Sequence, residues 1–581
     1  MKSFAAPSTP RRLADHSADR RMLMLAAAAV IVGTGGAMGA WLLLRAIAIA
    51  TNLFWFGRLS AAPSEISDNT LGLGLVAIPI IGSLIVGLMA RYGSDKIRGH
   101  GIPEAIEAIL YGESRLSPKV ALLKPLSSAI SIGSGGPFGA EGPIIMTGGA
   151  IGSLFAQQFN LSAAERKTLL VAGAAAGMTA IFGTPVAALL LAIEVLLFEW
   201  KPRSFVPVVI ATLSAFLWRP YLIDSGPLFP VMHHALLGPA TIAIALAMGA
   251  LAGCQASLLS ILLYRVEDMF GRLPLHWMWW PAIGAVSVGI GGLIDAHVLG
   301  AGYESIRALL DGSMALRVAL ALLVVKAAVW LIALGSGTSG GVLAPLLMLG
   351  GALGFVIGHF LPGGSALWAL AGMAGTMSGA MRAPLTAALF VAELTGDFAM
   401  LPLTVAASVG AYAVSVLLIR RSILTEKIAR RGRHVLQEYS VDPLDFLQAG
   451  QVMTPDPYTL PGSLSLAEAI NFFATAKHRS YPVVDAKGRL IGLVSRSDAL
   501  RWQMEENAPL KASLAEVLSD VSLPFATPQN PISQIADMMV DSGIGRIPVV
   551  DPATSRLVGI LSRHDMLKVR HVHRAAERRR R

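Results

Sequence analysis

The strongest constraint on this chain is a long stretch, from about Met22 to Ile419, in which charged side chains are sparse. The chain has 581 residues, of which 54% are hydrophobic and only 14% are charged, whereas soluble domains carry roughly 25% charged residues. The first apolar run, Met22–Ala50, is longer than a signal-peptide core and long enough for a retained spanning helix. Because a spanning backbone must pair its own polar groups, the sequence predicts a polytopic all-α membrane protein.

Other apolar segments are too short to cross a bilayer, for example Pro143–Phe159 and Thr184–Leu197. Glycine and proline bound both segments. This pattern is typical of broken helices whose ends meet near the middle of the membrane. Irregular backbone is tolerated there only where it lines a protected cavity.

The apolar region contains an internal repeat. Two segments share proline, glycine and alanine positions at one displacement of 202 residues: Pro143, Gly148, Gly149, Ala150 and Gly152 return as Pro345, Gly350, Gly351, Ala352 and Gly354. A second pair of segments starts at Pro185 and Pro384, and a glutamate follows each proline by nine residues, Glu194 and Glu393. The preserved spacing indicates duplicated halves, which commonly place a substrate at their interface. We expect Glu194 and Glu393 to make structural hydrogen bonds rather than to carry protons.

The net charge of +10 is concentrated outside the apolar runs, at Arg11–Arg21, Arg420–Arg433 and Arg574–Arg581. Lysine and arginine flank spanning helices on the cytoplasmic side, so the basic tails 1–21 and 571–581 are expected in the cytoplasm. Solvation or attraction to anionic lipid explains the same charge, and nothing beyond charge indicates nucleic-acid binding. The only cysteine, Cys254, excludes an internal disulfide and is expected to fill space in the core.

Glu141 is the residue whose setting points most directly to function. It stands in Gly139-Ala140-Glu141-Gly142-Pro143, within a mostly apolar stretch. Ionisable groups inside membrane segments commonly mark an ion path, and Pro143 suits the first turn of a helix. A helix N-terminus attracts anions. The alternative is a carboxylate that only complements the helix dipole.

With these residues in view, the region 22–432 resembles the CLC chloride channels and chloride/proton antiporters. The resemblance rests on four segments in the family's order and spacing: Gly99-His100-Gly101-Ile102-Pro103-Glu104, Gly139-Ala140-Glu141-Gly142-Pro143, Phe182-Gly183-Thr184-Pro185 leading to Glu194, and Gly341-Val342-Leu343-Ala344-Pro345. It implies an inverted repeat of broken helices whose N-termini hold an anion without a full cation. Such weak binding suits conduction, because the ion must also leave.

The resemblance also implies roles for individual residues. Glu141 corresponds to the gating glutamate, whose carboxylate competes with the anion for one position. The backbone N–H groups of Val342 and Leu343 correspond to donors at a central anion position, and those of Gly139, Ala140, Glu141 and Gly142 to donors at an outer one. His100 and Leu424 stand at two further anion-contacting positions.

Four positions depart from the family's usual residues. His100 replaces a serine that donates to the anion, and a protonated imidazole would make binding depend on pH. Leu343 replaces a phenylalanine, which leaves the backbone donors in place. Leu424 replaces the tyrosine at the inner end, so a hydroxyl ligand is lost. Val195 occupies the position of the proton-transfer glutamate of many antiporters, and it cannot carry a proton.

The Val195 substitution favours a channel-like pathway for chloride, as in voltage-gated members of the family. A chloride/proton antiporter is the alternative, because water chains can replace the missing glutamate. A fluoride exporter of the same family is a further alternative, left open by His100. The family resemblance also implies a homodimer with one pathway in each subunit, and we expect it in a bacterial inner membrane.

Residues 452–505 and 518–570 resemble a tandem pair of CBS domains, joined to the membrane region by a linker, 433–451. Each copy has a Pro-Val-Val-Asp turn and a Gly-hydrophobic-hydrophobic-Ser-x-x-Asp segment, which supplies Ser495 and Asp498 in the first and Ser562 and Asp565 in the second. Helical patterns at Leu466–Ala476 and Ile532–Asp541 complete a small α/β unit. The Ser-x-x-Asp segments can hold an adenine nucleotide. They also match a helix capping box, which needs no ligand.

Two other functional classes fit the sequence less well. A divalent-cation carrier needs several oxygen ligands in one place, and carboxylates in the membrane region are few and scattered. An enzyme is not expected, because no clustered metal ligands and no nucleophile–base pair stand out. We therefore expect no required cofactor and no metal site.

Overall fold

The computed structural model describes residues 21–69, 71–231, 237–433, 435, 444, 447–505, 508–519 and 523–578. The chain divides into two compact units, one within His16–Glu438 and the other containing Tyr439–Arg581. Most of the predicted tail 1–21 and most of the linker 433–451 lie outside the described residues. The described part of the predicted basic tail 571–581, residues 571–578, is helical and continues the last helix.

The first half of the larger unit is entirely helical where it is described. Its longest helix opens the unit, and its shortest pieces lie between longer helices. The elements are α1 (Arg21–Phe56), η1 (Ile66–Asp68), η2 (Gly72–Val76), α2 (Ala77–Tyr92), η3 (Asp95–Ile97), α3 (Ile102–Tyr111), α4 (Pro118–Gly133), α5 (Glu141–Gln157), α6 (Ala163–Phe182), α7 (Pro185–Leu191), the π-helical turn η4 (Ala192–Leu197) and α8 (Pro202–Leu222).

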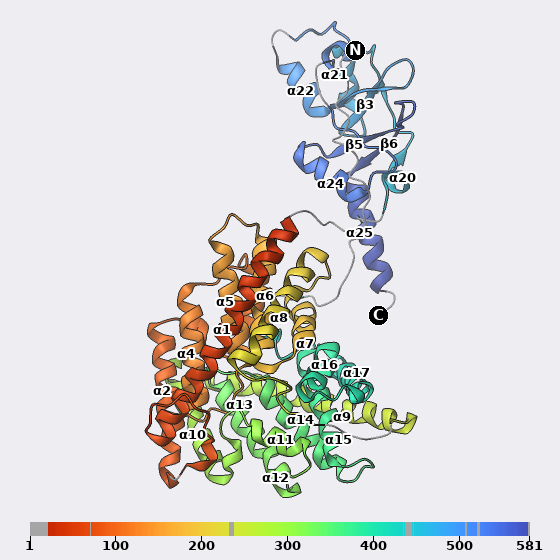
Figure 1. Ribbon diagram of the computed structural model, residues 1–581. Coiled ribbons are helices and arrows are strands. Elements are labelled where there is room, and N and C mark those ends of the chain that lie inside the picture. Colours follow the sequence, from red (N-terminus) through yellow and green to blue (C-terminus); the bar gives the residue numbers. More distant parts are fainter. Residues whose placement is uncertain are drawn as a thin grey trace. The chain divides into compact units, whose positions relative to one another are not determined.

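The second half repeats this order of long and short helices. The elements are α9 (Pro239–Gly271), η5 (Trp277–Trp279), α10 (Trp280–Ile294), η6 (Ala296–Val298), α11 (Tyr303–Leu310), α12 (Leu316–Ala321), the π-helical turn η7 (Leu322–Lys326), α13 (Ala327–Gly335), α14 (Leu343–Gly358), α15 (Ser365–Met381), α16 (Pro384–Thr395), η8 (Phe398–Met400) and α17 (Leu401–Leu418). The short helix α18 (Glu426–Arg430) follows. In Figure 1 the first half runs from red to yellow and the second from green to cyan.

The repeat predicted from sequence appears in the helix boundaries. Helix α5 starts at Glu141 and α14 at Leu343, while α7 starts at Pro185 and α16 at Pro384. Local signals set many of these ends: Ser162 and Glu165 form a capping box at the start of α6. The prediction of short, broken helices is thus confirmed.

In the part of the chain that the structure describes, seven helical segments are long and apolar enough to cross a membrane, among them Arg21–Phe56 and Pro239–Gly271. Shorter apolar helices, such as Leu343–Gly358 and Pro384–Thr395, lie among them. The chain is therefore a multi-pass membrane protein. Cys254 is exposed on α9, so the expectation that it fills the core is wrong. The helix is apolar on both its packed and its outer face, and sequence hydrophobicity alone does not separate the two.

Close helix packing holds each half together. Helix α5 packs on α6 through glycines that bring the backbones into contact: a Cβ on Gly148 would lie 2.2 Å from the carbonyl oxygen of Gly173. The corresponding pair in the second half is α14 and α15, where a Cβ on Gly354 would lie 2.0 Å from the carbonyl oxygen of Trp368. Small residues of this kind let two helix backbones approach closely. Close packing matters in a membrane because the hydrophobic effect does not drive helices together there.

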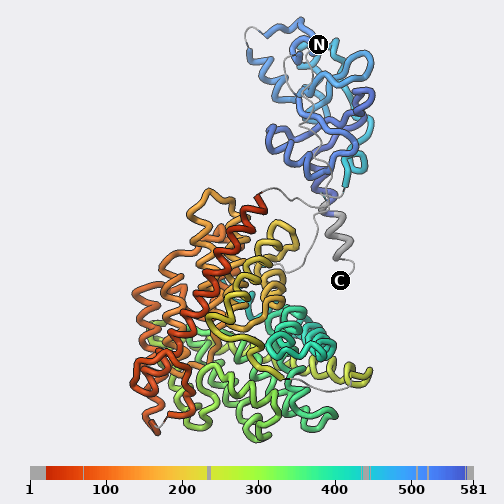
Figure 2. The backbone as a smooth tube through the Cα atoms, viewed as in Figure 1, coloured from red at the N-terminus to blue at the C-terminus, as the bar shows by residue number. Residues whose placement is uncertain are grey.

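The smaller unit contains two similar α/β halves, drawn in blue in Figure 2. Each has a three-stranded sheet, in the orders β2-β3-β4 and β1-β6-β5. The strands are β1 (Thr454–Pro455), β2 (Leu460–Pro461), β3 (Ser480–Val484), β4 (Leu490–Ser495), β5 (Arg546–Val550) and β6 (Leu557–Ser562). The helices are α20 (Ala449–Val452), α21 (Leu466–Thr475), α22 (Arg496–Met504), α23 (Leu514–Val517), α24 (Ile532–Asp541) and α25 (Arg563–Arg578).

The predicted helices of this unit are present as α21 and α24, and its two hairpins have the same register. Ser480 pairs with Ser495 and Arg546 pairs with Ser562, and both hairpins carry an irregularity near the end of the first strand. Strand β1 comes from the first half of the unit and pairs with β6 of the second. The two halves therefore share a sheet and form one unit.

Replacing Gly152 by alanine tests the packing of α5 on α6. The new Cβ would lie 2.0 Å from the carbonyl oxygen of Leu169, so the backbones must separate. Overpacking of this kind costs about 1–3 kcal/mol, and we expect a lower temperature of thermal unfolding in detergent. The control is Gly271→Ala, where a Cβ meets nothing within 4 Å. Equal thermal stability of the two variants would contradict the packing argument.

Candidate functional site

Three glycine-containing loops, far apart in sequence, meet inside the larger unit. The three loops lead into the helices α3, α5 and α14. Gly139 and Gly341 form an antiparallel bridge in which the Gly341 N–H donates to the Gly139 carbonyl at 3.0 Å. Gly99 bridges to Ser339, and its N–H donates to the Thr338 carbonyl at 3.2 Å. The structure thus brings together the three segments that the sequence analysis selected.

These loops approach so closely that a side chain would not fit at several glycines. A Cβ on Gly142 would lie 1.9 Å from the carbonyl oxygen of His100, and one on Gly139 would lie 1.9 Å from a carboxylate oxygen of Glu141. Glycine at these positions therefore permits three helix starts to share one small space.

Glu141 is the first residue of α5 and is fully buried. Its carboxylate lies against Gly139 and Gly341, since a Cβ on Gly341 would be 2.5 Å from one carboxylate oxygen. The same carboxylate lies beside the backbone amides of Glu141 and Ala344, at the starts of α5 and α14. Neither carboxylate oxygen has a partner at hydrogen-bond geometry among the described residues. An acidic side chain thus stands between two helix N-termini, where the partial positive charge is largest.

Val342 and Leu343 stand at the start of α14, and both are fully buried. The first amides of an α-helix have no carbonyl four residues before them to bond. The N–H groups of this segment are therefore available to a ligand, and the leucine side chain does not alter them.

His100 lies in the loop before α3, between Gly99 and Gly101, and is 3% exposed. Both of its ring nitrogens lack a hydrogen-bond partner among the described residues. Gly101 has φ +88°, a left-handed conformation that glycine adopts without strain. The loop thereby turns sharply into α3 and leaves a buried imidazole with unused hydrogen-bonding capacity.

A buried lysine that the sequence analysis did not select holds this loop in place. Lys124 of α4 is fully buried, and its amine donates to the carbonyls of Ile97 at 2.8 Å and Gly99 at 2.7 Å and to the Ser339 hydroxyl at 3.0 Å. The three segments themselves contain no lysine or arginine, but folding brings this cation to them. A lysine inside an apolar run was the available signal.

The second half has the same arrangement. Lys326, displaced from Lys124 by 202 residues, is also fully buried, and its amine donates to the carbonyls of Val298 at 2.7 Å and Gly300 at 2.9 Å. It anchors the loop before α11 as Lys124 anchors the loop before α3. The spacing of the two lysines equals the displacement of the internal repeat, so the lysines are a further sign of the duplication in the sequence.

A cavity of about 240 Å³ lies beside His100 and is lined mainly by charged side chains, including Arg98, Glu267, Lys427, Arg430 and Arg431. Glu104 of α3 forms ion pairs with Lys427 at 3.0 Å and Arg431 at 3.1 Å. This carboxylate in the first turn of α3 is thereby joined to α18 and to the residue that follows it. Basic groups outnumber acidic ones around this cavity, which suits the approach of an anion.

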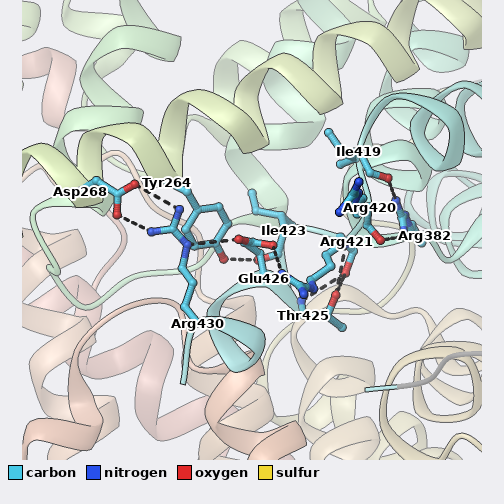
Figure 3. Close-up of polar contacts among 11 residues, drawn as sticks. Tyr264, Asp268, Arg382, Ile419, Arg420, Arg421, Ile423, Thr425, Glu426 and Arg430 are labelled. Carbon is cyan, nitrogen blue, oxygen red and sulfur yellow. Dashed lines mark hydrogen bonds and ion pairs between the residues drawn. The ribbon is translucent and has the colours of Figure 1, made fainter. Parts of the chain in front are cut away.

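Leu424 is fully buried in the loop that leads into α18. Figure 3 shows how this loop is fixed: the Tyr264 hydroxyl donates to the Ile423 carbonyl at 2.6 Å, and Arg430 pairs with Asp268 at 3.2 Å. Glu267 and Asp268 lie in the last turns of α9, where Glu267 lines the cavity and Asp268 pairs with Arg430.

Val195 is fully buried in the π-helical turn η4. The neighbouring Glu194 accepts from the Thr386 amide at 2.9 Å and the Thr386 hydroxyl at 2.6 Å, at the start of α16. Glu393 accepts from the amides of Val186 at 3.0 Å and Ala187 at 2.8 Å, at the start of α7. The prediction of structural hydrogen bonds is confirmed, and each glutamate caps a helix of the other half.

In the smaller unit, both Ser-x-x-Asp segments form capping boxes. The Ser495 amide donates to Asp498 at 3.0 Å at the start of α22, and the Ser562 amide donates to Asp565 at 2.8 Å at the start of α25. The capping role considered from sequence is thus present. The described residues contain no cluster of metal-ligating side chains.

Comparison with known proteins identifies a different sequence family in each unit. The sequence model described as voltage gated chloride channel matches residues 81–416, and that of the CBS domain matches 449–505 and 515–572. The chain is 31% identical over 365 residues to the voltage-gated ClC-type chloride channel ClcB of Escherichia coli O81 (strain ED1a), covering 61% of this chain and 87% of the relative. The same identity and coverage relate it to ClcB of Shigella flexneri.

Solved structures share the fold at lower identity. A slow cyanobacterial Cl−/H+ antiporter aligns with TM-score 0.62 at 23% identity, over 71% of this chain and 99% of the other. A eukaryotic CLC transporter aligns with TM-score 0.57 at 20% identity, over 94% and 98%. A CLC-type fluoride/proton antiporter aligns with TM-score 0.60 at 19% identity, over 69% and 97%.

Replacing Glu393 tests the capping between the halves. Leucine leaves the buried amides of Val186 and Ala187 without an acceptor, at a cost of about 1–3 kcal/mol for each unsatisfied group. We expect Glu393→Leu to lower the temperature of thermal unfolding in detergent, and Glu393→Gln, which keeps one acceptor oxygen, to lower it less. A leucine variant as stable as the unmodified protein would contradict the capping role.

Proposed function

Since this chain belongs to the voltage-gated chloride channel (CLC) family and carries two CBS domains, we propose that it conducts chloride through the meeting point of the three loops, with Glu141 as the gate. Chloride transport is the family's activity, and the protein is a transporter or channel rather than an enzyme. The observation that carries the proposal is the position of the Glu141 carboxylate, between the N-termini of α5 and α14. An anion and this carboxylate would compete for the same amides.

The remaining contacts follow from the same geometry. The amides of Val342 and Leu343 would bind an anion at the start of α14, and those from Gly139 to Gly142 would bind one at the start of α5. The two buried ring nitrogens of His100 have no partner among the residues that the structure describes, so a neutral imidazole has one N–H to donate. At the position of Leu424 the pathway would lack a hydroxyl ligand.

We propose a channel-like mechanism because Val195 cannot transfer a proton and Glu194 and Glu393 are engaged at helix starts. A chloride/proton antiporter and a fluoride exporter are the alternatives. Chloride efflux from liposomes, measured with an ionophore that dissipates voltage and with simultaneous recording of external pH, separates them. Chloride flux without proton movement supports the channel, coupled proton uptake supports the antiporter, and flux only with fluoride supports the exporter.

Glu141→Gln tests the gate. Glutamine has the shape of the protonated glutamate but cannot take the negative charge that competes with an anion. We therefore expect chloride flux at neutral pH to rise toward the flux at acid pH, and the dependence of flux on pH to flatten. The measurement is chloride efflux from liposomes across a pH series.

The matched control for this variant is Glu304→Gln on α11, whose carboxylate is 57% exposed and pairs with Arg307. It should leave the pH dependence unchanged. If Glu141→Gln retains the full pH dependence, His100→Gln in the same background decides whether the imidazole supplies it. Retention in both variants would overturn the gating role of Glu141.

The family also suggests an assembly and a location. We propose a homodimer with one pathway in each subunit, embedded in a bacterial inner membrane with both termini in the cytoplasm. Mass measurement of the purified protein in detergent tests the dimer, and protease access to the C-terminal unit in oriented vesicles tests the side.

We propose that the CBS pair binds an adenine nucleotide through Ser495, Asp498, Ser562 and Asp565. Because these side chains now bond each other, a nucleotide must replace part of each capping box. We expect ATP, ADP or AMP to raise the temperature of thermal unfolding of the full chain, and Asp565→Asn to reduce that shift. No shift with any of the three nucleotides would leave the segments as helix caps alone.

A further inference from the structure

Tyr303 is the first residue of α11 and is not among the residues that the sequence analysis selected. Its hydroxyl oxygen is buried and has no partner at hydrogen-bond geometry among the described residues. It lies beside the backbone amide of Ala140 and within electrostatic reach of the Glu141 carboxylate. A tyrosine from the second half thus reaches the start of α5 in the first half.

The position of this hydroxyl is fixed from three directions. Gly302, just before Tyr303, has φ +74° and turns the chain into α11. Lys326 holds the preceding loop through the carbonyls of Val298 and Gly300. The ring of Phe229 packs edge-on against the tyrosine ring with 6.0 Å between centroids, and the Phe229 amide donates to the Leu394 carbonyl at 2.9 Å.

Two complementary polar groups, both without a partner at hydrogen-bond geometry among the described residues, therefore lie near the start of α5. The Glu141 carboxylate accepts hydrogen bonds only, and the Tyr303 hydroxyl has a proton to donate. A buried polar group without a partner costs about 1–3 kcal/mol. In the observed conformation the carboxylate lies between Gly139 and Gly341 and does not reach the hydroxyl. Rotation of the Glu141 side chain away from the two helix starts would let one bond satisfy both groups.

We propose that Tyr303 is a positioning residue for the gate, whose hydroxyl donates a hydrogen bond to the Glu141 carboxylate after it has left the space between Gly139 and Gly341. This inference rests on the proposed gating role of Glu141. The bond stabilises the displaced, still ionised carboxylate. An anion can then occupy the amides that the carboxylate has vacated without the gate first taking up a proton.

Other charged groups near the three loops are engaged elsewhere. On the side of α3 and α4, the Lys124 amine donates to two carbonyls and the Ser339 hydroxyl, and Glu104 pairs with Lys427 and Arg431. His100 lies in the electrostatic field of these groups. In the second half, the Lys326 amine is bonded to two carbonyls and faces Asp295. From α11, the Tyr303 hydroxyl interacts electrostatically with Glu141.

The test is Tyr303→Phe, which removes only the hydroxyl. A hydrogen bond to a charged group is worth about 1.5–3 kcal/mol, so chloride flux from liposomes at neutral pH should fall about tenfold or more. At acid pH, where the gate is protonated, the loss should be smaller, and the dependence of flux on pH becomes steeper. Tyr303→His, which keeps a donor, should recover part of the neutral-pH flux. The matched control is Tyr92→Phe, at a side chain that is 81% exposed.

The same substitution in a Glu141→Ala background identifies the mechanism. With no carboxylate to hold, Tyr303→Phe should change the flux by less than twofold. An equal loss of flux with and without the Glu141 carboxylate would overturn the inference, because the hydroxyl would then act on the anion itself. An unchanged flux at neutral pH in Tyr303→Phe alone would also overturn it. If Glu141→Ala alone leaves flux and its pH dependence as they were, the proposed gate has failed, and this is known before Tyr303 is tested. Equal elution and thermal stability of the variants exclude misfolding.

Discussion

The close approach of three backbone loops is the constraint on which the larger unit depends. Glycine at Gly139, Gly142 and Gly341 permits this approach, because a Cβ at any of them would overlap a neighbouring atom. Once the loops touch, the first amides of α5 and α14 face a common space, and their partial charges add. The buried amine of Lys124 then ties the loop before α3 to the loop before α14. The site therefore uses backbone groups whose positions are set by packing, and its charged side chains act mainly as anchors.

Much of this arrangement could be predicted from the sequence. The repeat of glycines and prolines gave the order of the short helices, and the setting of Glu141 pointed to the start of α5. The carboxylate's surroundings could not be predicted, because they depend on residues some two hundred positions away, such as Gly341 and Ala344. For the same reason Tyr303 was not predicted, because it belongs to an ordinary helical pattern until folding brings it to the loops. Lys124 did carry a signal, as a lysine in an apolar run that recurs as Lys326, but the loops that it holds became visible only in the fold.

The exposed face of α9 and the capping boxes show a second limit on what the sequence can predict. Cys254 stands in a helix that is apolar all round, so hydrophobicity could not decide whether it faces the protein or its surroundings, and the expectation of a core position was wrong. At Ser495 and Ser562 the ambiguity is chemical. The hydroxyl and carboxylate that would hold a nucleotide are the atoms that cap the following helix. Either use requires the same two residues three positions apart, so the pattern alone cannot separate them.

The exchange of helix caps between the halves has a consequence for how the protein is made. The amides that open α7 are satisfied by Glu393, which follows Ala187 by 206 residues. During synthesis the first half therefore enters the membrane with one helix start still lacking its acceptor, and it remains incomplete until nearly all of the second half has followed. Either half produced alone would retain exposed donors in an apolar medium. Gene duplication thus yielded two copies that are no longer independent folding units.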